Sequence, residues 1–436
     1  MIQAKNVFII GIGGIGTSAA AKWWKAQGAK VSGSDVYRNG IVHDLENEGI
    51  KVYLGHSADN IPFDCDLVIH SRAVPVGNVE RQVAAERGIL DISYPEFLGE
   101  LSKLHKTIAV SGTNGKSTTT AMIASVLIEA NLDPTVVLGS KMADWPHKNL
   151  RIGNGDLLVT EACEHMASFL NIMPDIAIVT NIEEDHLDFY RDLDQIRDTF
   201  QLWIDKAKNA VVINKRDKES QKLKIKKKIE FDYSDRVVAS GKQKFVVDGD
   251  EYELSIPGEF NVQNAAAAIA VGRYLQIKPE IIRNALVKFK GTWRRFEKVG
   301  LWKGAEIYSD YAHHPTAIRG AIRAFKEFFP DRRLIVVFQP HQHSRTHELF
   351  AEFVKSFDEA DIAMIMEVYE VAGRTEEKYE SGQDLVDEMK NLRKIPVYYV
   401  ADIKKAENKL RDLVKKDDII VCMGAGSIDE LARKLV

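Results

Sequence analysis

Residues 111–120 read Ser-Gly-Thr-Asn-Gly-Lys-Ser-Thr-Thr-Thr, a glycine-containing loop that ends in a lysine and hydroxyl side chains. Glycines let backbone N–H groups surround a polyphosphate, a lysine neutralises phosphate oxygens, and a serine hydroxyl can bind Mg²⁺. The apolar run 107–110 precedes this loop, and the helix-like stretch 121–130 follows it. We therefore expect a strand, a helix and, between them, a triphosphate-binding loop with these residues: Gly112, Thr113, Asn114, Gly115, Lys116, Ser117 and Thr118.

The spacing of this loop is unusual. The common phosphate-loop pattern has a glycine five residues before the glycine of Gly-Lys-Ser. That position holds Val110 here, and the nearer glycine is Gly112. A strand, turn and helix without a ligand is the plain alternative, but the intact Lys-Ser-Thr end favours phosphate binding.

A second glycine-rich turn, Gly-Ile-Gly-Gly-Ile-Gly over residues 11–16, follows the apolar run 7–10 and precedes the helix-like stretch 17–27. Asp35 stands at the end of the next strand-like run. This is the dinucleotide fingerprint, which predicts NAD or any other nucleotide diphosphate, because the helix N-terminus binds phosphate rather than nicotinamide. The alternative is that these glycines serve only tight packing of a strand on a helix.

Two candidate metal ligands follow strand-like runs near the phosphate loop. Glu161 follows the run 157–160, and His186 lies beyond the run 176–180. Mg²⁺ prefers hard oxygen ligands, which Ser117 and Glu161 can supply, and His186 could serve a second ion. A hydrogen-bonded histidine at a strand end is the alternative for His186, because histidine is an uncommon Mg²⁺ ligand.

The C-terminal third contains two loops rich in histidine, at 310–315 and 339–346. We interpret them as a substrate clamp. His341 and His343 could bind zinc, but no further ligands follow at a suitable spacing. The lysine-rich segment 222–228 is most simply a solvated edge, because it lacks the aromatic residues that nucleic-acid sites interleave with basic ones.

Strand-like and helix-like runs alternate along the whole chain of 436 residues, which predicts parallel α/β sheets. The length requires several cores, and we expect three domains, at 1–105, 106–293 and 294–436. Asn261 and Asn264 are expected to precede an alanine-rich helix in the second domain, and the run 315–328 is expected to be a helix in the third.

Composition limits the partners. The net charge of −4 comes from 59 basic and 63 acidic residues, so we expect no nucleic-acid partner and no anionic membrane surface. Three scattered cysteines fit reduced thiols in a cytoplasmic protein. No apolar run is long enough to span a bilayer, and the N-terminus lacks the features of a signal peptide.

Taken together, these motifs resemble the Mur ligase family, the ATP-dependent amino-acid ligases of peptidoglycan assembly. The resemblance extends over nearly the whole chain. It rests on these segments: the glycine turn 11–16 with Ser34-Asp35, the phosphate loop, Glu161-Ala162 with Ser168-Phe169-Leu170, Thr180-Asn181-Ile182, Asp185-His186-Leu187-Asp188, Asn261 and Asn264, Arg294-Arg295-Phe296, the loop 310–315, Ser344-Arg345-Thr346 and Gly424-Ala425-Gly426.

The resemblance implies three α/β domains: a Rossmann-like N-terminal domain that binds the UDP part of a sugar nucleotide, a central P-loop ATPase-like domain, and a C-terminal Rossmann-like domain that closes over the substrates. It implies an enzyme that uses ATP and Mg²⁺ to join L-alanine to the lactyl carboxylate of UDP-N-acetylmuramate through an acyl phosphate. A monomer or homodimer is expected.

The resemblance also implies residue roles. Ser117 and Glu161 would bind Mg²⁺, and His186 would serve a second ion. Lys116, Glu161, His186, His314 and Arg345 would be catalytic, with the last two orienting the amino acid. The nucleotide would be held by the phosphate loop with Asn264, Arg295 and Asp310. The UDP-sugar would contact these residues: Gly11, Gly13, Gly14, Ile15, Gly16, Ser34, Asp35 and Ser71.

Two segments depart from the pattern of the members that add L-alanine. Residues 161–166 read Glu-Ala-Cys-Glu-His-Met instead of Glu-Ala-Asp-Glu-Ser-Asp, and Gln342 replaces an arginine. A neutral side chain cannot form the bidentate carboxylate pair that arginine forms, so another amino acid remains an alternative.

A ligase that joins a preformed tripeptide in murein recycling is a second alternative, although residues 368–373 resemble the alanine-adding members better. From other classes, an NAD-dependent oxidoreductase would explain residues 11–35 but not Lys116, and a non-catalytic UDP-sugar-binding protein would bind without releasing ADP.

Overall fold

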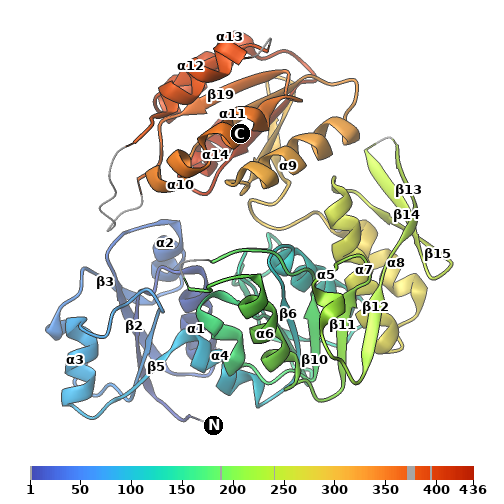
Figure 1. The fold of residues 1–436 in the computed structure, drawn as a ribbon. Coiled ribbons are helices and arrows are strands. Elements are labelled where there is room, and N and C mark those ends of the chain that lie inside the picture. The colour runs from blue at the N-terminus through green and yellow to red at the C-terminus, as the bar shows by residue number, and fades with distance from the viewer. Residues whose placement is uncertain (1, 187–188, 240, 371–378, 393–394) are drawn as a thin grey trace. The chain divides into compact units, whose positions relative to one another are not determined.

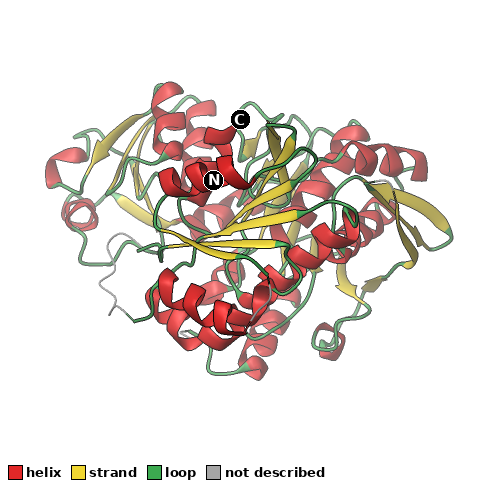
Figure 2. Cartoon of the chain, turned by 90° about the horizontal axis from the view of Figure 1, so that it is seen from above, coloured by secondary structure: helices red, strands yellow, loops and turns green. Residues whose placement is uncertain are grey.

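The computed structural model describes residues 2–186, 189–239, 241–370, 379–392 and 395–436, which form four sheets (Figure 1). They divide into two compact units, Met1–Tyr233 with Gln263–Leu286, and Ser234–Val262 with Val287–Val436. Figure 2 shows the α/β layering, with helices on both sides of strands. Within each unit, the sheets position the candidate site residues.

The N-terminal sheet has five parallel strands in the order β3-β2-β1-β4-β5. Its central strands are apolar on both faces, as expected for a parallel sheet covered by helices. The glycine turn lies between β1 and α1 at the carboxyl edge of this sheet. The elements are β1 (Asn6–Ile10), α1 (Ile15–Ala26), β2 (Lys30–Asp35), α2 (Gly40–Asn47), β3 (Lys51–Leu54), β4 (Leu67–His70), α3 (Val79–Glu86), β5 (Leu90–Ser93) and α4 (Tyr94–Ser102).

The central sheet has seven strands in the order β12-β11-β10-β6-β9-β7-β8, and only β8 is antiparallel. Strand β6 lies between β10 and β9, so the loops that follow these three strands share one edge. The strands are β6 (Lys106–Ser111), β7 (Thr135–Val137), β8 (Leu150–Arg151), β9 (Leu157–Glu161), β10 (Ile176–Val179), β11 (Ala210–Asn214) and β12 (Lys228–Phe231). The helices are α5 (Lys116–Glu129), the 3₁₀ helix η2 (His165–Asn171), α6 (Leu193–Ile204), α7 (Glu259–Tyr274) and α8 (Pro279–Lys288).

The second unit contains a three-stranded antiparallel sheet and a six-stranded sheet of order β16-β17-β21-β18-β19-β20, in which only β16 is antiparallel. The strands are β13 (Ser234–Ala239), β14 (Lys242–Val247), β15 (Asp250–Leu254), β16 (Glu297–Trp302), β17 (Ala305–Asp310), β18 (Leu334–Phe338), β19 (Ile362–Met366), β20 (Val397–Val400) and β21 (Ile419–Met423). The helices are α9 (Pro315–Phe328), α10 (His343–Glu348), α11 (Phe350–Val354), α12 (Gly382–Leu392), α13 (Ile403–Leu413) and α14 (Ile428–Leu435).

The predicted α/β class is confirmed, and α9 has the predicted bounds. Two element predictions are wrong. The helix after the phosphate loop begins at Lys116 rather than Ala121, because Gly115 adopts a left-handed φ of 84° and directs the next residue into the helix. Asn261 and Asn264 lie inside α7 rather than before it. The antiparallel sheet β13–β15 was not predicted, because its short strands alternate polar and apolar residues instead of forming apolar runs.

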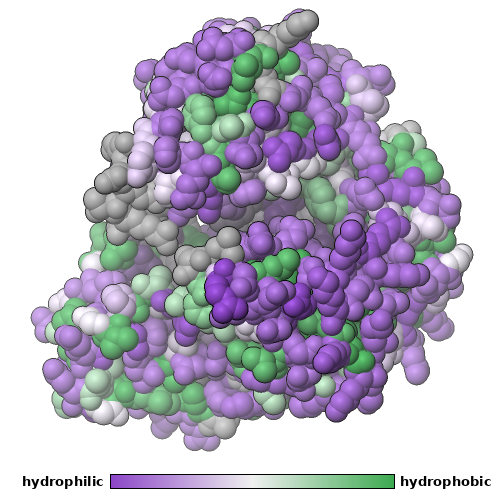
Figure 3. All heavy atoms as spheres, in the orientation of Figure 1, coloured by the Kyte–Doolittle hydropathy of each residue, from purple (hydrophilic) through white to green (hydrophobic). Residues whose placement is uncertain are grey.

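Among the described residues no helix is long and apolar enough to cross a membrane. Hydrophilic side chains predominate on the face drawn in Figure 3, and apolar ones are scattered among them. The domain boundaries at 105/106 and 293/294 stay predictions.

Candidate functional site

The glycine turn of the N-terminal sheet is supported by Asp35. Gly11 has a φ of 75°, which favours glycine, and its N–H donates to Ser34 O (2.8 Å). The N–H of Gly13 donates to Asp35 Oδ2 (2.8 Å), and a Cβ on Gly13 would lie 2.9 Å from the same oxygen. The carboxylate that the fingerprint assigns to a ribose therefore braces the turn in this structure.

The remaining glycines of the turn lie at the start of α1, where their lack of a side chain permits close packing. Gly14 precedes α1, which starts at Ile15. A Cβ on Gly16 would lie 2.5 Å from the Tyr94 ring, so this glycine permits α1 to pack on α4. Ser71 lies beside the turn, because a Cβ on Gly11 would be 3.1 Å from the Ser71 Cβ.

Ser34 is tied to a buried carboxylate. Its hydroxyl donates to Glu80 Oε2 (2.6 Å), and Glu80 is 0% exposed. His56 Nδ1 lies 2.8 Å from Glu80 Oε2, and Asn60 Nδ2 donates to Glu80 Oε1 (2.7 Å). This network holds the end of β2 against α3.

The phosphate loop lies against β10 and α7. Gly112 has a φ of 133°, and a Cβ there would lie 2.1 Å from Thr180 Oγ1. A Cβ on Gly115 would lie 2.4 Å from Asn264 Oδ1, which also accepts a hydrogen bond from Thr119 (3.1 Å). The structure therefore brings Asn264, predicted to bind the nucleotide, to the phosphate loop.

Asn114 and Thr113 complete the loop contacts. The N–H of Asn114 donates to Asn181 Oδ1 (2.9 Å), and Thr180 Oγ1 donates to Asn114 O (2.5 Å). Thr113 N donates to Asn181 O (3.0 Å). Thr118 is buried in the first turn of α5. The residues that follow β10 thus hold the backbone of the loop through hydrogen bonds.

Lys116 forms a charge pair with Glu164. Lys116 Nζ lies 2.8 Å from Glu164 Oε1 and also donates to Gly112 O (2.5 Å). Burial alone would lower the pKa of Lys116, but the Glu164 carboxylate opposes this and the pKa is raised. Glu164 is itself buried, and its Oε2 has no hydrogen-bond partner among the described residues. The lysine is therefore held as a cation at the phosphate loop.

Ser117 and Glu161 form the predicted metal pair. Ser117 Oγ donates to Glu161 Oε2 (2.9 Å), and the N–H of Gly139 donates to Glu161 Oε1 (2.5 Å). Two hard oxygen donors converge beside a helix N-terminus that favours phosphate. These two side chains are suitable ligands for a Mg²⁺ ion that binds together with a nucleoside triphosphate.

His186 lies beside Glu164 and Asp185. Its Nε2 is 3.8 Å from Glu164 Oε1 and 3.8 Å from Asp185 Oδ2, and ligand atoms of the three residues lie within 4.8 Å of one another. Its ring stacks on His165, with centroids 4.3 Å apart. Burial lowers the pKa of His186 against the opposing effect of Asp185, which favours the neutral imidazole that metals bind.

In the second unit, Asp310 ends β17, His314 follows that strand, Arg345 follows β18, and Arg295 precedes β16. Asp310 is buried, and burial raises its pKa. It accepts hydrogen bonds from Phe296 N (2.9 Å) and Ala312 N (2.9 Å). The Arg295 guanidinium lies 5.9 Å from the Tyr311 ring centroid. Asp310 therefore anchors the turns on both sides of it.

The histidine loops lie at the same edge of the sheet. His314 caps α9, where its Nδ1 accepts from Thr316 N (3.4 Å). Burial lowers the pKa of His313 to about 4, and Arg345 adds to this effect. The His313 ring lies 6.1 Å from His341, centroid to centroid. The structure thus brings Arg345 and the histidines of both loops together.

Sequence reasoning missed Glu164 as a site residue. Its position three residues after Glu161 is the signal that could have identified it. Leu187, Asp188 and residues 371–373, which contributed to the resemblance, lie outside the described residues.

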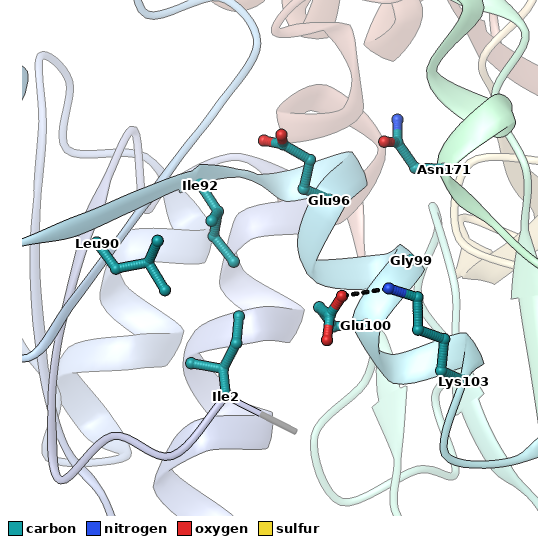
Figure 4. Close-up of a pocket in the computed structure, with 8 residues that line it drawn as sticks. All are labelled: Ile2, Leu90, Ile92, Glu96, Gly99, Glu100, Lys103 and Asn171. Carbon is teal, nitrogen blue, oxygen red and sulfur yellow. Dashed lines mark hydrogen bonds and ion pairs between the residues drawn. The ribbon is translucent and has the colours of Figure 1, made fainter.

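A pocket of about 400 Å³ beside β5 and α4 contains the Glu100–Lys103 ion pair (2.5 Å) and none of the predicted site residues (Figure 4).

Three family domains match the chain in order. They are described as "Mur ligase family, catalytic domain" over residues 6–106, "Mur ligase middle domain" over 110–272 and "Mur ligase, glutamate ligase domain" over 294–426. A UDP-N-acetylmuramate–L-alanine ligase of Sulfurihydrogenibium sp. (strain YO3AOP1) is 37% identical over 447 residues, which cover 99% of this chain and 97% of that protein. The chain belongs to the Mur ligase family.

Solved structures agree with this membership. The UDP-N-acetylmuramate–alanine ligase of Thermotoga maritima matches with a TM-score of 0.88 and 30% identity, over 99% of this chain and 98% of that one. A murein peptide ligase of Psychrobacter arcticus matches with a TM-score of 0.68 and 22% identity, over 99% and 98%, which shows the fold alone. The predicted three-domain Mur ligase fold is confirmed. The prediction of a ligase that uses ATP and Mg²⁺ is confirmed as well.

Proposed function

We propose that this Mur ligase joins L-alanine to the lactyl carboxylate of UDP-N-acetylmuramate, with conversion of ATP to ADP and phosphate, in peptidoglycan precursor synthesis. The observation that carries the proposal is the convergence of Lys116, Ser117 and Glu161 at the phosphate loop, in a chain similar from end to end to L-alanine ligases. A carboxylate does not react with amines at neutral pH, so it must first be phosphorylated.

In the first step, Lys116 would move its ammonium from Glu164 to the γ-phosphate and offset the charge that spreads over the phosphoryl oxygens. The backbone of residues 112–115 would hold the β-phosphate. Mg²⁺ held by Ser117 and Glu161 would supply further charge neutralisation when bound, and His186 is proposed to serve a second ion. An acyl phosphate and ADP result.

In the second step, the amine of L-alanine attacks the acyl carbon, and phosphate leaves. We propose that His314 and Arg345 orient the amino acid, that Asp310 binds the ATP ribose, and that Arg295 and Asn264 bind the nucleotide. The UDP part is proposed to lie on the glycine turn 11–16 with Ser34, Asp35 and Ser71. Arg345 supports the assignment of the amino-acid site, because its guanidinium can pair with the substrate carboxylate in a bidentate manner.

The departures at residues 163–166 and Gln342 leave amino-acid identity as the part of the proposal that most needs a test. Gln342 has a φ of 70°, and its backbone oxygen accepts from Thr346 N (3.1 Å) at the start of α10. Its neutral side chain offers no counterion for a substrate carboxylate. A murein-recycling activity would instead require a preformed tripeptide as the amine.

The decisive experiment measures phosphate release by the purified chain with Mg²⁺-ATP, UDP-N-acetylmuramate and each of the twenty amino acids or the tripeptide. Release that requires both UDP-N-acetylmuramate and L-alanine supports the proposal. If another amine is preferred, that amine replaces L-alanine as the proposed substrate. Binding of the UDP-sugar without ADP release would indicate a non-catalytic UDP-sugar-binding protein. NAD reduction without ATP use would indicate an oxidoreductase.

The variant Lys116→Ala should abolish phosphate release while retaining UDP-sugar binding, because Lys116 lies outside the glycine turn.

A cytoplasmic location is part of the proposal, since Cys65, Cys163 and Cys422 are free thiols. A monomeric or homodimeric state is likewise proposed and is measured by light scattering.

A further inference from the structure

Helix α1 carries two buried polar side chains on one face. Ser18 and Lys22 are four residues apart, one helical turn, and follow the glycine turn. Lys22 is only 2% exposed. A buried lysine costs free energy unless several acceptors surround its ammonium group, so its partners indicate what these side chains do.

The partners of Lys22 come largely from the loop between β7 and β8 of the central domain. Lys22 Nζ donates to His147 O (3.0 Å) and to Asn149 Oδ1 (3.1 Å). Glu48 Oε1, at the end of α2, lies 3.5 Å away. Burial lowers the pKa of Lys22, and Glu48 opposes this effect. The ammonium group is therefore shared by the two domains within the first compact unit.

Asn149 completes the connection from the other side. It is 1% exposed, and its Nδ2 donates to Ile15 O (2.6 Å) and Ser18 Oγ (3.0 Å). Its backbone oxygen accepts from Leu138 N (3.0 Å). Asn149 thus joins the first turn of α1, through its side chain, to Leu138 just after β7, through its backbone oxygen.

From Leu138 the connection reaches the predicted metal pair. Gly139 is the next residue, and its N–H donates to Glu161 Oε1 (2.5 Å). Glu161 Oε2 accepts from Ser117 Oγ (2.9 Å). Hydrogen bonds and the peptide link from Leu138 to Gly139 therefore connect the start of α1, which follows the glycine turn, to the Ser117–Glu161 pair.

We propose that Lys22 and Asn149 are positioning residues that hold the glycine turn 11–14 at a set distance from the Ser117–Glu161 pair. The carboxylate of a sugar nucleotide anchored on that turn then arrives at the γ-phosphate in line for attack. A misplacement of about 1 Å can lower a rate by about 100-fold, so such a clamp acts on turnover rather than on the affinity of either ligand. This inference rests on the proposed function.

The test compares Lys22→Met, Asn149→Asp and the matched control Lys25→Met in the full chain. Lys25 is an exposed lysine in the last turn of the same helix α1, so its replacement removes a lysine from α1 without touching the buried contacts of Lys22. We expect kcat to fall about 10-fold or more in the first two variants. The separately measured Kd values for UDP-N-acetylmuramate and Mg²⁺-ADP should stay within about threefold of wild type, and the control should keep wild-type kcat.

Asn149→Asp keeps an acceptor for Lys22 and replaces the donors to Ile15 and Ser18 with a carboxylate oxygen, so it remains informative if Lys22→Met does not fold. Folded variants with wild-type kcat would overturn the inference, as would equal losses in kcat and both affinities, which indicate general destabilisation. Wild-type protein that releases no phosphate with UDP-N-acetylmuramate and any amine would overturn the proposed function instead.

Discussion

At the scale of single residues, Glu164 is the group that most changes the interpretation of the phosphate loop. The family motif assigns Lys116 to phosphate, and Glu164 Oε1 lies 2.8 Å from the same ammonium. A bound phosphate would therefore compete with Glu164 for this cation. Because the pair is largely buried, its charges interact more strongly than a surface pair would.

Replacing Glu164 with Gln should leave Lys116 without its counterion. We expect the free energy of unfolding to fall by about 1–3 kcal/mol without nucleotide, because a buried charge loses its partner. A non-hydrolysable analogue of Mg²⁺-ATP should narrow this difference and bind several-fold more tightly, since its γ-phosphate would take the place of Glu164. Denaturant unfolding with and without this analogue measures both effects. An equal loss under both conditions would contradict the competition.

His313 predicts a pH dependence in the second unit. Burial holds its pKa at about 4, below the ordinary value of about 6.5, so the unfolded chain binds the proton more readily. The stability due to neutral His313 is present above about pH 6.5 and is lost as the pH falls to about 4, by up to about 3 kcal/mol. His313→Asn should remove this part of the slope, as unfolding measured from pH 7 to 4 would show. Parallel slopes for both proteins would exclude this role.

At the scale of elements, adjacent parallel strands explain why the site assembles. β10, β6 and β9 are neighbours, so the loops carrying His186, Lys116 and Glu161 share an edge. The unusual glycine spacing has a structural reason, because Gly112 lies against β10 where a Cβ would be 2.1 Å from Thr180 Oγ1. Gly112 is therefore required for its close contact with Thr180 as well as for phosphate binding.

Gly112→Ala should displace the phosphate loop. The added Cβ would clash with Thr180, and a φ of 133° is strained for alanine, so we expect a loss of about 2 kcal/mol or more in stability, with loss of ATP turnover. Gly320→Ala in α9 is the matched control, because nothing lies within 4 Å of the new Cβ, and it should stabilise by about 0.5–1 kcal/mol. Thermal unfolding and phosphate release measure both variants. Full ATP turnover in Gly112→Ala would contradict this explanation.

At the scale of the whole molecule, the compact units do not follow sequence order. Residues 234–262 group with 287–436 in the second compact unit, whereas the family's middle domain covers them within 110–272, and the boundary at 293/294 stays a prediction. Within this unit, Arg236 Nη1 donates to Glu327 Oε1 (2.7 Å), and Phe260 packs on Phe296 with centroids 5.3 Å apart. The C-terminal unit is therefore completed by an earlier part of the chain.

A fragment of residues 294–436 should accordingly be less stable than the second unit in the full chain. Loss of the Arg236 and Phe260 contacts should cost at least about 1–2 kcal/mol. Residues 234–262 joined to 287–436 by a Gly/Ser linker should recover the difference. Calorimetry of both fragments and the full chain measures it, and equal unfolding temperatures for the two fragments would argue against this assignment.

Much of the fold was accessible from the sequence because its signals are local. Apolar runs and glycine turns predicted the parallel strands, and Pro315 at the start of a periodic stretch predicted α9. The antiparallel sheet β13–β15 was not accessible, because short alternating strands resemble polar loops until their partners are known. Ser117, Glu161 and His186 were placed correctly at one sheet edge, since each follows a strand of the central sheet.

The sequence alone therefore identified the Mur ligase motifs and predicted their chemistry: a phosphate loop, hard oxygen ligands and a nucleotide-binding turn. Only the tertiary structure decided how these groups are held. Glu164 reaches Lys116 across 48 residues, and Asn149 reaches Lys22 across 127. Motif residues are close along the chain and can be read as local patterns, whereas supporting contacts depend on which strands and helices become neighbours after folding.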